Sequence, residues 1–459
     1  MMRVSEAAFA LGVEHRGDNP VFTSVGTDSR NVEPGELFIA LRGIHFDAHQ
    51  YLGAAHAAGA VAAMVDVTGA AQAPAALPLI TVNDTHKGLT QLAYAWRSRF
   101  TGPLVGLTGS SGKTTVKEML AGILREAADD AKNALLATRG NLNNEIGVPL
   151  TLLELRAEHR CAVIEMGMNH AGEISRLTRL ARPDVALITN AGRAHIEHLG
   201  SEEAIARAKG EIFEGLASNG VAVINSDDKH AALWRELCNK NKCLSFGLDH
   251  PADVGARYEL RALDSDIQID TPAGAVSVTL RAPGLHNVCN ALAACAAAFA
   301  LEVPPTAIAS GLSRYIGVKG RLQRTLAHAG ATLIDDTYNA NPESMRAAID
   351  VLARAPGRRL LVLGDMGELG ARAAACHTET GEYARAAGIE QLYALGELSA
   401  NTVAGFGTGA RHFPRIEEML ADIENILAPD MTVLVKGSRF MQMERVVKAF
   451  AVEQGTHTS

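Results

Sequence analysis

The sequence predicts an α/β protein of three domains, with a mostly parallel sheet in the central domain. The chain has 459 residues, which is too long for one hydrophobic core. From about residue 85 onward, short apolar runs alternate with helix-like segments, a pattern typical of parallel sheets. One of these runs leads into a Gly/Ser-rich loop and then a helix, the order in which proteins build a phosphate-binding loop.

The composition is that of an ordinary folded protein and argues against nucleic-acid and membrane partners. Hydrophobic residues make up 47% and charged residues 20%, as in ordinary folded domains. The formal net charge of −8 argues against a nucleic-acid partner held by a basic surface. The 6 cysteines show no metal-binding or C-x-x-C spacing, so we expect reduced thiols in a cytoplasmic protein. We expect no membrane association, because the sequence has neither a signal-like apolar core nor an uncharged run of spanning length.

Residues 1–84 are expected to form a small separate α/β domain, with strands near 37–41, 61–65 and 79–82 and a loop over 70–78. Polar residues gather in three of its segments, Thr27-Asp-Ser29-Arg30, Arg42-Gly43 and Asp47-Ala-His49. Hydroxyls and a guanidinium on adjacent loops could hold a uracil edge and a diphosphate. A solvated turn is the alternative, and the residues alone favour it.

The segment Thr108-Gly-Ser-Ser-Gly-Lys-Thr-Thr115 is the most informative stretch of the chain. It follows an apolar strand at 104–107 and opens a helix expected over 113–127. Glycines let the backbone approach an anion, and the N–H groups of the loop and helix start then point at phosphate. Lys113 would reach the terminal phosphates, and the Thr114 hydroxyl would hold Mg²⁺. The sequence therefore predicts a nucleoside triphosphate site.

The spacing of this loop is a variant of G-x-x-x-x-G-K-[ST], because Leu107 stands where the first glycine is usual. A flexible Gly/Ser hairpin is the alternative interpretation. The remaining loop residues expected at the nucleotide are Gly109, Ser110, Ser111, Gly112 and Thr115.

Polar residues follow two further strands of the expected central sheet, 161–164 and 185–188. Glu165 comes directly after the first, and His195 lies in the loop after the second. Because ligands lie beyond the carboxyl ends of parallel strands, Glu165 is placed to hold Mg²⁺ beside the phosphate loop. A strand-end acid in solvent is an equal alternative, and a lone histidine in a loop is more often structural.

A helix expected over 201–216 carries Lys209 on its apolar face, four residues after Ile205 and three before Ile212. Burial would lower the pKa of this lysine, and a neutral amine can react with CO₂ to give a carbamate. A carbamate could ligate a metal ion. The alternative is a lysine whose ammonium reaches solvent along the helix surface.

Amide side chains mark two other segments of the central domain. The stretch 138–149 includes Asn143 and Asn144 and is suited to oriented polar recognition, with a plain connecting loop as the alternative. Residues 256–280 alternate as a hairpin does and precede an Ala-rich helix over 288–301. Asn287 and Asn290 lie three residues apart at its start and could cap this helix or contact a nucleotide base.

A third alternating block begins near residue 317. Its expected strands, 331–334, 360–363, 391–395 and 432–435, each end in glycine or polar residues. These are Asp335-Asp336 with 337–341, the segment 364–370, Gly396, and Lys436-Gly-Ser-Arg439. No second phosphate loop occurs, so this block is not a repeat of the central domain.

Taken together, these residues closely resemble the Mur ligase family, whose members form amide bonds with ATP in peptidoglycan precursor synthesis. The resemblance covers nearly the whole chain. It rests on the loop 108–115, Glu165, His195, Lys209, Pro283-Gly-Leu-His-Asn-Val-Cys-Asn290, Gly320-Arg321 and Asp336. It implies a uridine-binding domain over 1–84, an ATP-binding domain over 85–316, and a Rossmann-like domain over 317–459 that binds the incoming amine.

The resemblance also implies roles for single residues. Lys113 would contact the β- and γ-phosphates, Thr114 and Glu165 would hold one Mg²⁺, and His195 with a carbamylated Lys209 would hold a second. Asn290 would lie near the adenine, Asn287 would also bind ATP, and Arg321 and Asp336 would close on ATP from the third domain. The substrate-binding residues would be Ser29, Arg30, Asn143, Asn144, Tyr338, Asn339, Asn341 and Lys436.

Within the family, four stretches match the branch that joins D-alanyl-D-alanine to UDP-N-acetylmuramoyl-tripeptide. They are 140–149, 208–213, 335–342 and 363–370. The D-N-P-R motif of the tripeptide-forming sibling is not found here, where Asn341-Pro-Glu-Ser344 is the nearest string. The resemblance implies an acyl-phosphate intermediate, ADP release, a monomer, and a place in cell-wall biogenesis, cell shape and division as the last cytoplasmic step toward the pentapeptide precursor.

Four alternatives remain open at this point. A sibling could add a single amino acid, and a folate polyglutamate ligase shares the family, although the first domain argues against it. A P-loop ATPase could hydrolyse ATP without ligation. A nucleotide-binding scaffold is disfavoured by the set of metal-ligand residues.

Overall fold

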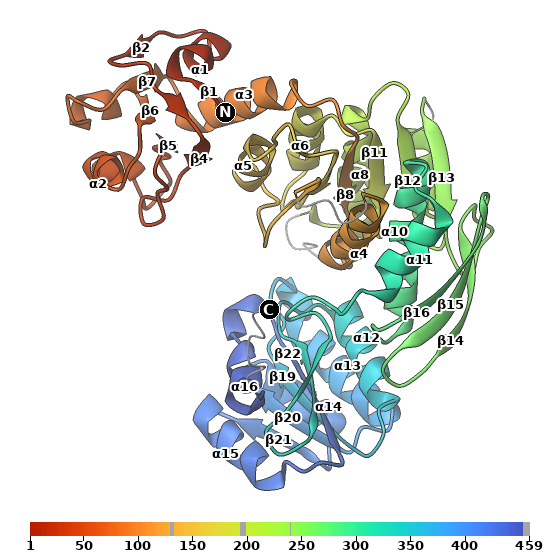
Figure 1. The fold of residues 1–459 in the computed structure, drawn as a ribbon. Coiled ribbons are helices and arrows are strands. Elements are labelled where there is room, and N and C mark those ends of the chain that lie inside the picture. Colours follow the sequence, from red (N-terminus) through yellow and green to blue (C-terminus); the bar gives the residue numbers. More distant parts are fainter. Residues whose placement is uncertain (129–132, 193–198, 239, 453–459) are drawn as a thin grey trace.

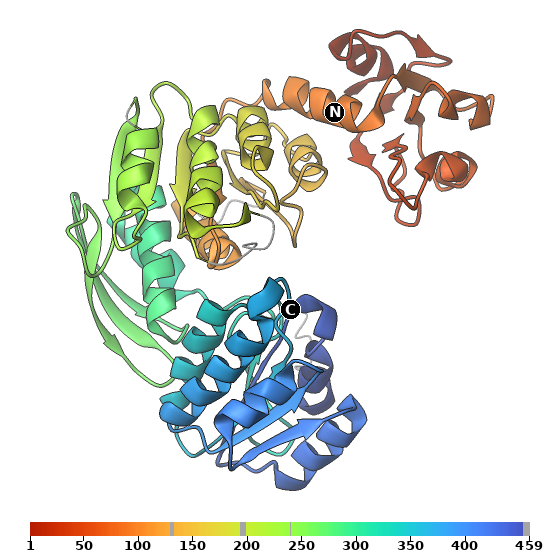
Figure 2. The same cartoon turned by 180° about the vertical axis from the view of Figure 1, so that it is seen from behind.

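The computed structural model describes residues 1–128, 133–192, 199–238 and 240–452, which fold into three α/β domains. The first domain stands at one end of the molecule, and the third lies on another side of the central domain (Figures 1 and 2). The three-domain α/β architecture expected from the sequence is confirmed.

The first domain is built on a five-stranded sheet with the order β2-β7-β6-β5-β4. Strands β4 to β7 are parallel neighbours, and β2 runs antiparallel to β7. The three expected strands are confirmed as β5, β6 and β7, whereas the expected loop 70–78 begins within the short 3₁₀ turn η2. The elements are β1 (Met2–Arg3), α1 (Val4–Ala10), β2 (His15–Arg16), β3 (Val21–Phe22), β4 (Ser24–Gly26), β5 (Glu36–Ile39), η1 (Ala48–Tyr51), α2 (Leu52–Ala57), β6 (Ala62–Asp66), η2 (Gly69–Gln72) and β7 (Leu79–Val82).

Helix α3 (Thr85–Arg97) joins the first domain to the central one and is anchored at its far end. The buried Arg97 guanidinium donates to Ala181 O at 2.7 Å and to Arg182 O at 3.1 Å. Trp96 Nε1 donates to Leu155 O at 3.0 Å. A second tie runs between the domains, because Arg156 Nη2 donates to Thr23 O at 2.8 Å. The first domain is therefore held to the central domain at two places.

The central sheet is parallel throughout and has the order β13-β12-β11-β8-β10-β9. Strand β8 carries the phosphate loop at its carboxyl end and lies between β10 and β11, which end at Glu165 and just before Thr189. The elements are β8 (Leu104–Thr108), α4 (Lys113–Ala127), β9 (Leu135–Ala137), α5 (Gly147–Leu153), β10 (Cys161–Glu165), α6 (Glu173–Ala181), β11 (Val185–Ile188), α8 (Glu202–Gly210), η3 (Glu211–Gly215), β12 (Val221–Asn225), α9 (Ala231–Leu237) and β13 (Lys242–Phe246).

Two hydrophobic cores cover the faces of this sheet. Helices α5, α6, α8 and α9 pack on one face, together with α3. Helix α4 packs on the other with α10 (Leu285–Ala300) and α11 (Pro305–Ser313). The inner strands β8, β10 and β11 are mostly apolar and fully buried, as expected for a sheet covered on both faces.

An antiparallel sheet of three strands packs against α10, where the sequence predicted only a hairpin. Strands β15 (Ser265–Thr271) and β16 (Gly274–Leu280) form the expected hairpin, and β14 (Gly255–Leu260) adds a third strand at its edge. The alternating stretch expected over 256–280 therefore covers three strands and not the two of a hairpin, and β14, which has no buried residue, lies at the sheet edge.

The third domain has a six-stranded sheet with the order β17-β18-β22-β19-β20-β21, in which β17 alone is antiparallel to its neighbour. Helices α12 to α14 cover one face, and α15 and α16 cover the other. The four expected strands are β18, β19, β20 and β22, and the sequence missed β17 and β21 at the edges. The elements are β17 (Gln323–Leu326), β18 (Thr332–Asp336), α12 (Pro342–Ala353), β19 (Arg358–Gly364), η4 (Gly370–Arg372), α13 (Ala373–Ala386), β20 (Gln391–Leu395), α14 (Ser399–Phe406), β21 (Ala410–Phe413), α15 (Ile416–Ile426), β22 (Met431–Lys436), η5 (Arg439–Met441) and α16 (Glu444–Phe450).

The helix expected over 201–216 was too long. Helix α8 ends at Gly210, and the 3₁₀ turn η3 continues the chain. Gly210 lies so close to α9 that an added Cβ would collide with Leu237. Glu211, directly after it, accepts from the backbone N–H of Gly172 at 2.8 Å, at the start of α6. These two contacts fix the tighter turn.

None of the helices within the described ranges has the length and apolar character needed to cross a membrane.

Glu36, at the start of β5, is a buried carboxyl group that should make the first domain sensitive to pH. Its side chain is 5% exposed, and Oε1 has no hydrogen-bond partner among the described residues. Burial raises the pKa of Glu36 from 4.5 to about 7. The folded state therefore keeps the proton until about pH 7, whereas the unfolded chain releases it near pH 4.5.

We expect the free energy of unfolding to fall by an amount on the order of 3 kcal/mol as the pH rises through this window, and then to level off. Glu36→Gln should match the wild type at pH 5 and exceed its stability at pH 8. Urea unfolding followed by circular dichroism at both values measures this, with the exposed Glu14→Gln in the same domain as the control. Parallel pH profiles for the wild type and Glu36→Gln would contradict it.

Candidate active site

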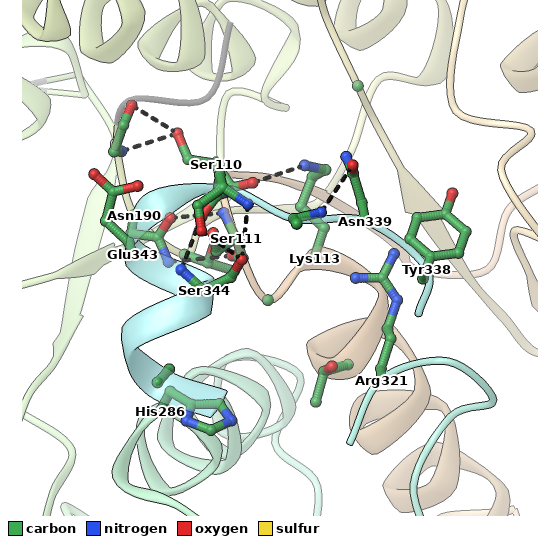
Figure 3. Close-up of a pocket in the computed structure, with 18 of the residues that line it drawn as sticks. Ser110, Ser111, Lys113, Asn190, His286, Arg321, Tyr338, Asn339, Glu343 and Ser344 are labelled. Carbon is green, nitrogen blue, oxygen red and sulfur yellow. Dashed lines mark hydrogen bonds between the residues drawn. The ribbon is translucent and has the colours of Figure 1, made fainter. Parts of the chain in front are cut away.

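A cleft of about 1070 Å³ lies between the central and third domains. Figure 3 shows the phosphate loop with Ser110, Ser111 and Lys113 beside Arg321, Tyr338 and Asn339. The first three belong to the central domain, and the other three follow it in the chain as part of the third. The cleft therefore joins groups that are more than 200 residues apart in sequence.

The phosphate loop is held by the end of β11. Ser111 N donates to Asn190 Oδ1 at 2.9 Å, and Ser110 N donates to Asn190 O at 3.0 Å. Gly112 has a φ of +81°, and a Cβ there would collide with Asn290 Oδ1. A Cβ on Gly109 would collide with Thr189 Oγ1. Both glycines are thus required by close approaches as well as by the turn.

Lys113 opens α4 and folds back over the loop, where Nζ donates to Gly109 O at 2.7 Å. Burial lowers the pKa of Lys113, and the nearby Glu165 carboxylate opposes this shift. The ammonium thus lies at the helix N-terminus, among backbone N–H groups suited to an anion. This arrangement is suited to the terminal phosphates of a nucleotide.

Glu165 is the centre of a small oxygen-rich group. Thr114 Oγ1 donates to Glu165 Oε2 at 2.9 Å, and Asn143 Nδ2 donates to Oε1 at 2.8 Å. The backbone N–H of Glu165 donates to Thr138 Oγ1 at 2.9 Å. The carboxylate is 2% exposed and lines the cleft. The sequence placed Thr114 and Glu165 near one another, and the structure brings them into contact.

Lys209 lies in α8 with a side chain that is buried yet lines the cleft. Burial and the neighbouring Lys113 ammonium lower the pKa of Lys209 well below its ordinary value. The apolar helical face expected from the sequence is buried as well, at Ile205 and Ile212. The alternative of a lysine reaching solvent is wrong, because the side chain is only 2% exposed.

Asn287 and Asn290 line the cleft and do not cap α10. The N-cap residue is Gly284, without a side-chain hydrogen bond. Asn287 Nδ2 donates to Pro283 O at 2.8 Å, and Asn290 Nδ2 donates to Asn287 Oδ1 at 3.2 Å. Asn290 Oδ1 faces Gly112 of the phosphate loop. Of the two roles left open by the sequence, contact with a bound nucleotide fits this placement.

The third domain contributes a loop that is tied to its own sheet. Lys436 Nζ lies 2.6 Å from Asp336 Oδ2 and donates to Asn339 O at 2.9 Å. The guanidinium of Arg321 stacks over the Tyr338 ring at 4.1 Å. Asn341 caps α12, since its Oδ1 accepts from Ser344 N at 2.8 Å. These contacts fix the conformation of residues 336–341, most of which line the cleft.

Most site residues expected from the sequence meet in this cleft. Those that line it are Ser110, Ser111, Gly112, Lys113, Thr115, Asn143, Asn144, Glu165, Lys209, Asn287, Asn290, Arg321, Asp336, Tyr338, Asn339, Asn341 and Lys436. Gly109 and Thr114 do not line it but contact Lys113 and Glu165, which do. Ser29 and Arg30 lie apart in the first domain, where Arg30 pairs with Asp28 at 2.7 Å. His195 lies outside the described residues.

Several residues of the site were missed by the sequence analysis. The sequence analysis gave Asn190 no role, although its place just after a strand of the parallel sheet was the available signal. Arg439 and Phe440 line the third-domain end of the cleft, after β22. Glu343 and Ser344 line it from the start of α12. These residues carry no motif of their own, and only their place at strand or helix ends could have pointed to them.

Within the described ranges, no group of three or more His, Cys, Asp or Glu side chains is placed to hold a metal ion. A site built from Thr114 and Glu165 would draw on a hydroxyl and one carboxylate, which are oxygen ligands of the kind Mg²⁺ takes from proteins. The residues present at this point of the cleft therefore fit Mg²⁺.

Comparison with known proteins finds three family models along the chain. They are the Mur ligase family catalytic domain over residues 21–97, the Mur ligase middle domain over 107–298, and the Mur ligase glutamate ligase domain over 320–439. Together they match all three domains of the fold.

Individual relatives extend the match to nearly the full length. The UDP-N-acetylmuramoyl-tripeptide–D-alanyl-D-alanine ligase of Escherichia coli is 40% identical over 99% of both chains. The structure of MurF from Acinetobacter baumannii superposes with a TM-score of 0.88, at 37% identity over 97% of both chains. MurF ligase from Thermotoga maritima in complex with ADP gives a TM-score of 0.81, at 28% identity over 94% of this chain and 97% of that one. On these matches, the chain belongs to the Mur ligase family.

Proposed function

We propose that this enzyme is an ATP-dependent ligase that joins D-alanyl-D-alanine to UDP-N-acetylmuramoyl-tripeptide, releasing ADP and phosphate. The observation that carries the proposal is the single cleft in which Lys113 of the phosphate loop lies beside the third-domain loop at 336–341. The relatives that match nearly the whole chain bear the name of this activity. The product would be the pentapeptide precursor used in peptidoglycan synthesis.

The nucleotide would bind with its phosphates at the start of α4. The loop N–H groups and Lys113 face that point, and Gly112 and Asn290 meet beside it. Asn290 would lie near the adenine, and Asn287 would also bind ATP. Arg321 and Asp336 would approach the nucleotide from the third domain, whose loop already lines the same cleft.

Thr114 and Glu165 would hold one Mg²⁺, and a second would be held by His195 and a carbamylated Lys209. The first assignment is supported by the contact between the Thr114 hydroxyl and the Glu165 carboxylate. When bound, Mg²⁺ supplies positive charge that neutralises the phosphate oxygens. The second assignment is supported by the burial of Lys209, because only a neutral amine reacts with CO₂ and burial lowers the pKa of this amine.

The chemistry would proceed in two steps. The terminal carboxylate of the tripeptide attacks the γ-phosphorus of ATP, forming an acyl phosphate and expelling ADP. The neutral amine of D-alanyl-D-alanine then attacks the acyl carbon, the tetrahedral intermediate loses a proton from nitrogen and collapses, and phosphate leaves. The first step joins two anions, so the Lys113 ammonium stabilises charge that builds up between them. Because water would hydrolyse the acyl phosphate, the two domains that line the cleft would close over the substrates before this intermediate forms.

The remaining proposed substrate contacts run from the first domain, through the central domain, to the third. Ser29 and Arg30 would hold the uridine diphosphate end in the first domain, and Asn143 and Asn144 would lie along the path to the phosphate loop. Tyr338, Asn339, Asn341 and Lys436 would place the incoming dipeptide. We assign these tasks to domains spanning 1–84, 85–316 and 317–459, and Asp84, which caps α3, supports the first boundary.

We also propose that the enzyme acts in the cytoplasm as a monomer, without a nucleic-acid or membrane partner. Its cysteines form no disulfide among the described residues, which suits a reducing compartment. Its negative net charge disfavours nucleic acid.

The test is ADP release with ATP, Mg²⁺ and UDP-N-acetylmuramoyl-tripeptide, with and without D-alanyl-D-alanine. Release that depends on the dipeptide supports the proposal. Release that depends on a single amino acid would assign the enzyme to a sibling activity. Release without either acceptor would favour an ATPase that ligates nothing.

A further inference from the structure

Lys117 is a buried lysine that the chemistry above does not use. It lies in α4 one turn beyond Lys113, and its side chain is 1% exposed. Burying an ammonium costs several kcal/mol unless it is paired and hydrogen-bonded. A buried ammonium therefore needs hydrogen-bonding or charged partners. The identity of these partners shows which segment of the chain Lys117 fixes in place.

The ammonium of Lys117 has two partners. Nζ donates to the backbone carbonyl oxygen of Thr138 at 2.5 Å and lies 2.8 Å from Glu118 Oε1. Thr138 comes directly after β9, which is a three-residue strand at the edge of the sheet and, within the described ranges, has β10 as its one neighbour. Lys117 therefore ties the end of a weakly paired edge strand to the helix that begins at the phosphate loop.

The segment held by Lys117 surrounds Glu165. The Thr138 hydroxyl accepts from the backbone N–H of Glu165 at 2.9 Å. Asn143, five residues further on, donates from Nδ2 to Glu165 Oε1 at 2.8 Å and accepts from Gly167 N at 2.7 Å through its own carbonyl oxygen. Two of the contacts that orient Glu165 thus come from the chain that Lys117 anchors, and the third comes from Thr114 on the same helix as Lys117.

We propose that Lys117 is a positioning residue, which fixes Thr138 and the loop after it so that Glu165 turns its carboxylate toward Thr114. One helix then sets both sides of the site, with Thr114 in its first turn and Lys117 in its second. The inference rests on the proposed function in one respect, since it assigns Glu165 the task of holding Mg²⁺. It adds a residue that touches neither nucleotide nor metal.

The test measures binding of ADP at equilibrium, by calorimetry, over a range of Mg²⁺ concentrations and again in EDTA. Lys117→Met removes the charge and nearly keeps the side-chain length. We expect the half-saturating Mg²⁺ concentration to rise about tenfold, the effect of losing a group that orients a metal ligand. The affinity for ADP in EDTA should not change. The exposed Lys448→Met is the matched control and should behave as the wild type.

A second pair of variants separates positioning from general stability. In a Glu165→Gln background, Lys117→Met should add no further change, because its effect passes through Glu165. Thr138→Val should likewise raise the half-saturating Mg²⁺ concentration, because it removes the hydroxyl that accepts from Glu165 N, and Thr138→Ser, which keeps the hydroxyl, should not. If Lys117→Met does not fold, Lys117→Gln, a shorter polar side chain without the charge, takes its place in both measurements, because it also loses the contact with Thr138 O.

Two outcomes would overturn the inference. One is an equal loss of ADP affinity with Mg²⁺ and in EDTA, and the other is an undiminished effect of Lys117→Met in the Glu165→Gln background. If the enzyme showed these binding properties but no dipeptide-dependent ADP release, the positioning role would stand and the proposed ligase activity would fail.

Discussion

Replacing Lys113 with methionine is expected to lower the rate of ADP formation by about a thousandfold, the scale seen when a group that stabilises transition-state charge is removed. The ammonium lies over the phosphate loop, 2.7 Å from Gly109 O, and lines the cleft. Transfer of the γ-phosphoryl group to a carboxylate brings two anions together, and a neutral thioether leaves their repulsion uncompensated. The measurement is ADP release under saturating substrates.

Two further variants sharpen this prediction. Lys113→Arg keeps the charge but presents a planar fork in place of a compact ammonium, so it should recover only part of the rate. Lys87→Met, on the exposed face of α3, should leave the rate unchanged. Thermal unfolding of all three proteins shows whether the fold is intact. Turnover by Lys113→Met within a few-fold of the wild type would refute the assignment of the phosphate site.

Replacing Lys209 with alanine is expected to reduce activity by about a hundredfold, with partial recovery in millimolar acetate or formate. The side chain is 2% exposed, and burial with the nearby Lys113 ammonium holds the pKa of Lys209 well below its usual range. A lower pKa increases the share of neutral amine, the form that can react with CO₂ to give a carbamate. A small carboxylate can enter the space left by the deleted side chain and replace its oxygens.

The carbamate itself can be observed. Wild-type enzyme equilibrated with ¹³C-bicarbonate should show a carbamate carbon signal in its NMR spectrum, and Lys209→Ala should lack this signal. Lys113→Met serves as the control for rescue, because acetate cannot replace an ammonium. Full activity of an unmodified lysine in bicarbonate-depleted buffer would contradict the carbamate, and so would rescue of both variants alike.

The parts of the site that the sequence predicted are those encoded locally. The order of strand, loop and helix at 104–127 lies within one short stretch, and Lys209 shares a helical face with residues only a few positions away. The contacts that hold these parts depend on the fold. Asn190 reaches Ser111 across 79 residues, and Lys436 reaches Asp336 across 100. No periodicity in the sequence could have paired them.

The errors in the predicted elements have the same origin. Helix α8 ends early because Gly210 packs against α9, which follows it in the chain by about twenty residues. Strands β17 and β21 were missed because both are four-residue strands at sheet edges with at most one buried side chain. The boundary of each element was thus decided by a tertiary neighbour that the local sequence does not contain.

The anchoring of α3 has a consequence for which substrates can react. Arg97 and Trp96 fasten this helix to the central domain, and Arg156 adds a tie to Thr23. With the uridine end bound in the first domain as proposed, the span from that end to the phosphate loop is set by the protein. The two docked domains then fix the distance between the uridine site and Lys113. A precursor with one peptide residue fewer would be too short to span this distance, so its length alone would exclude it as a substrate.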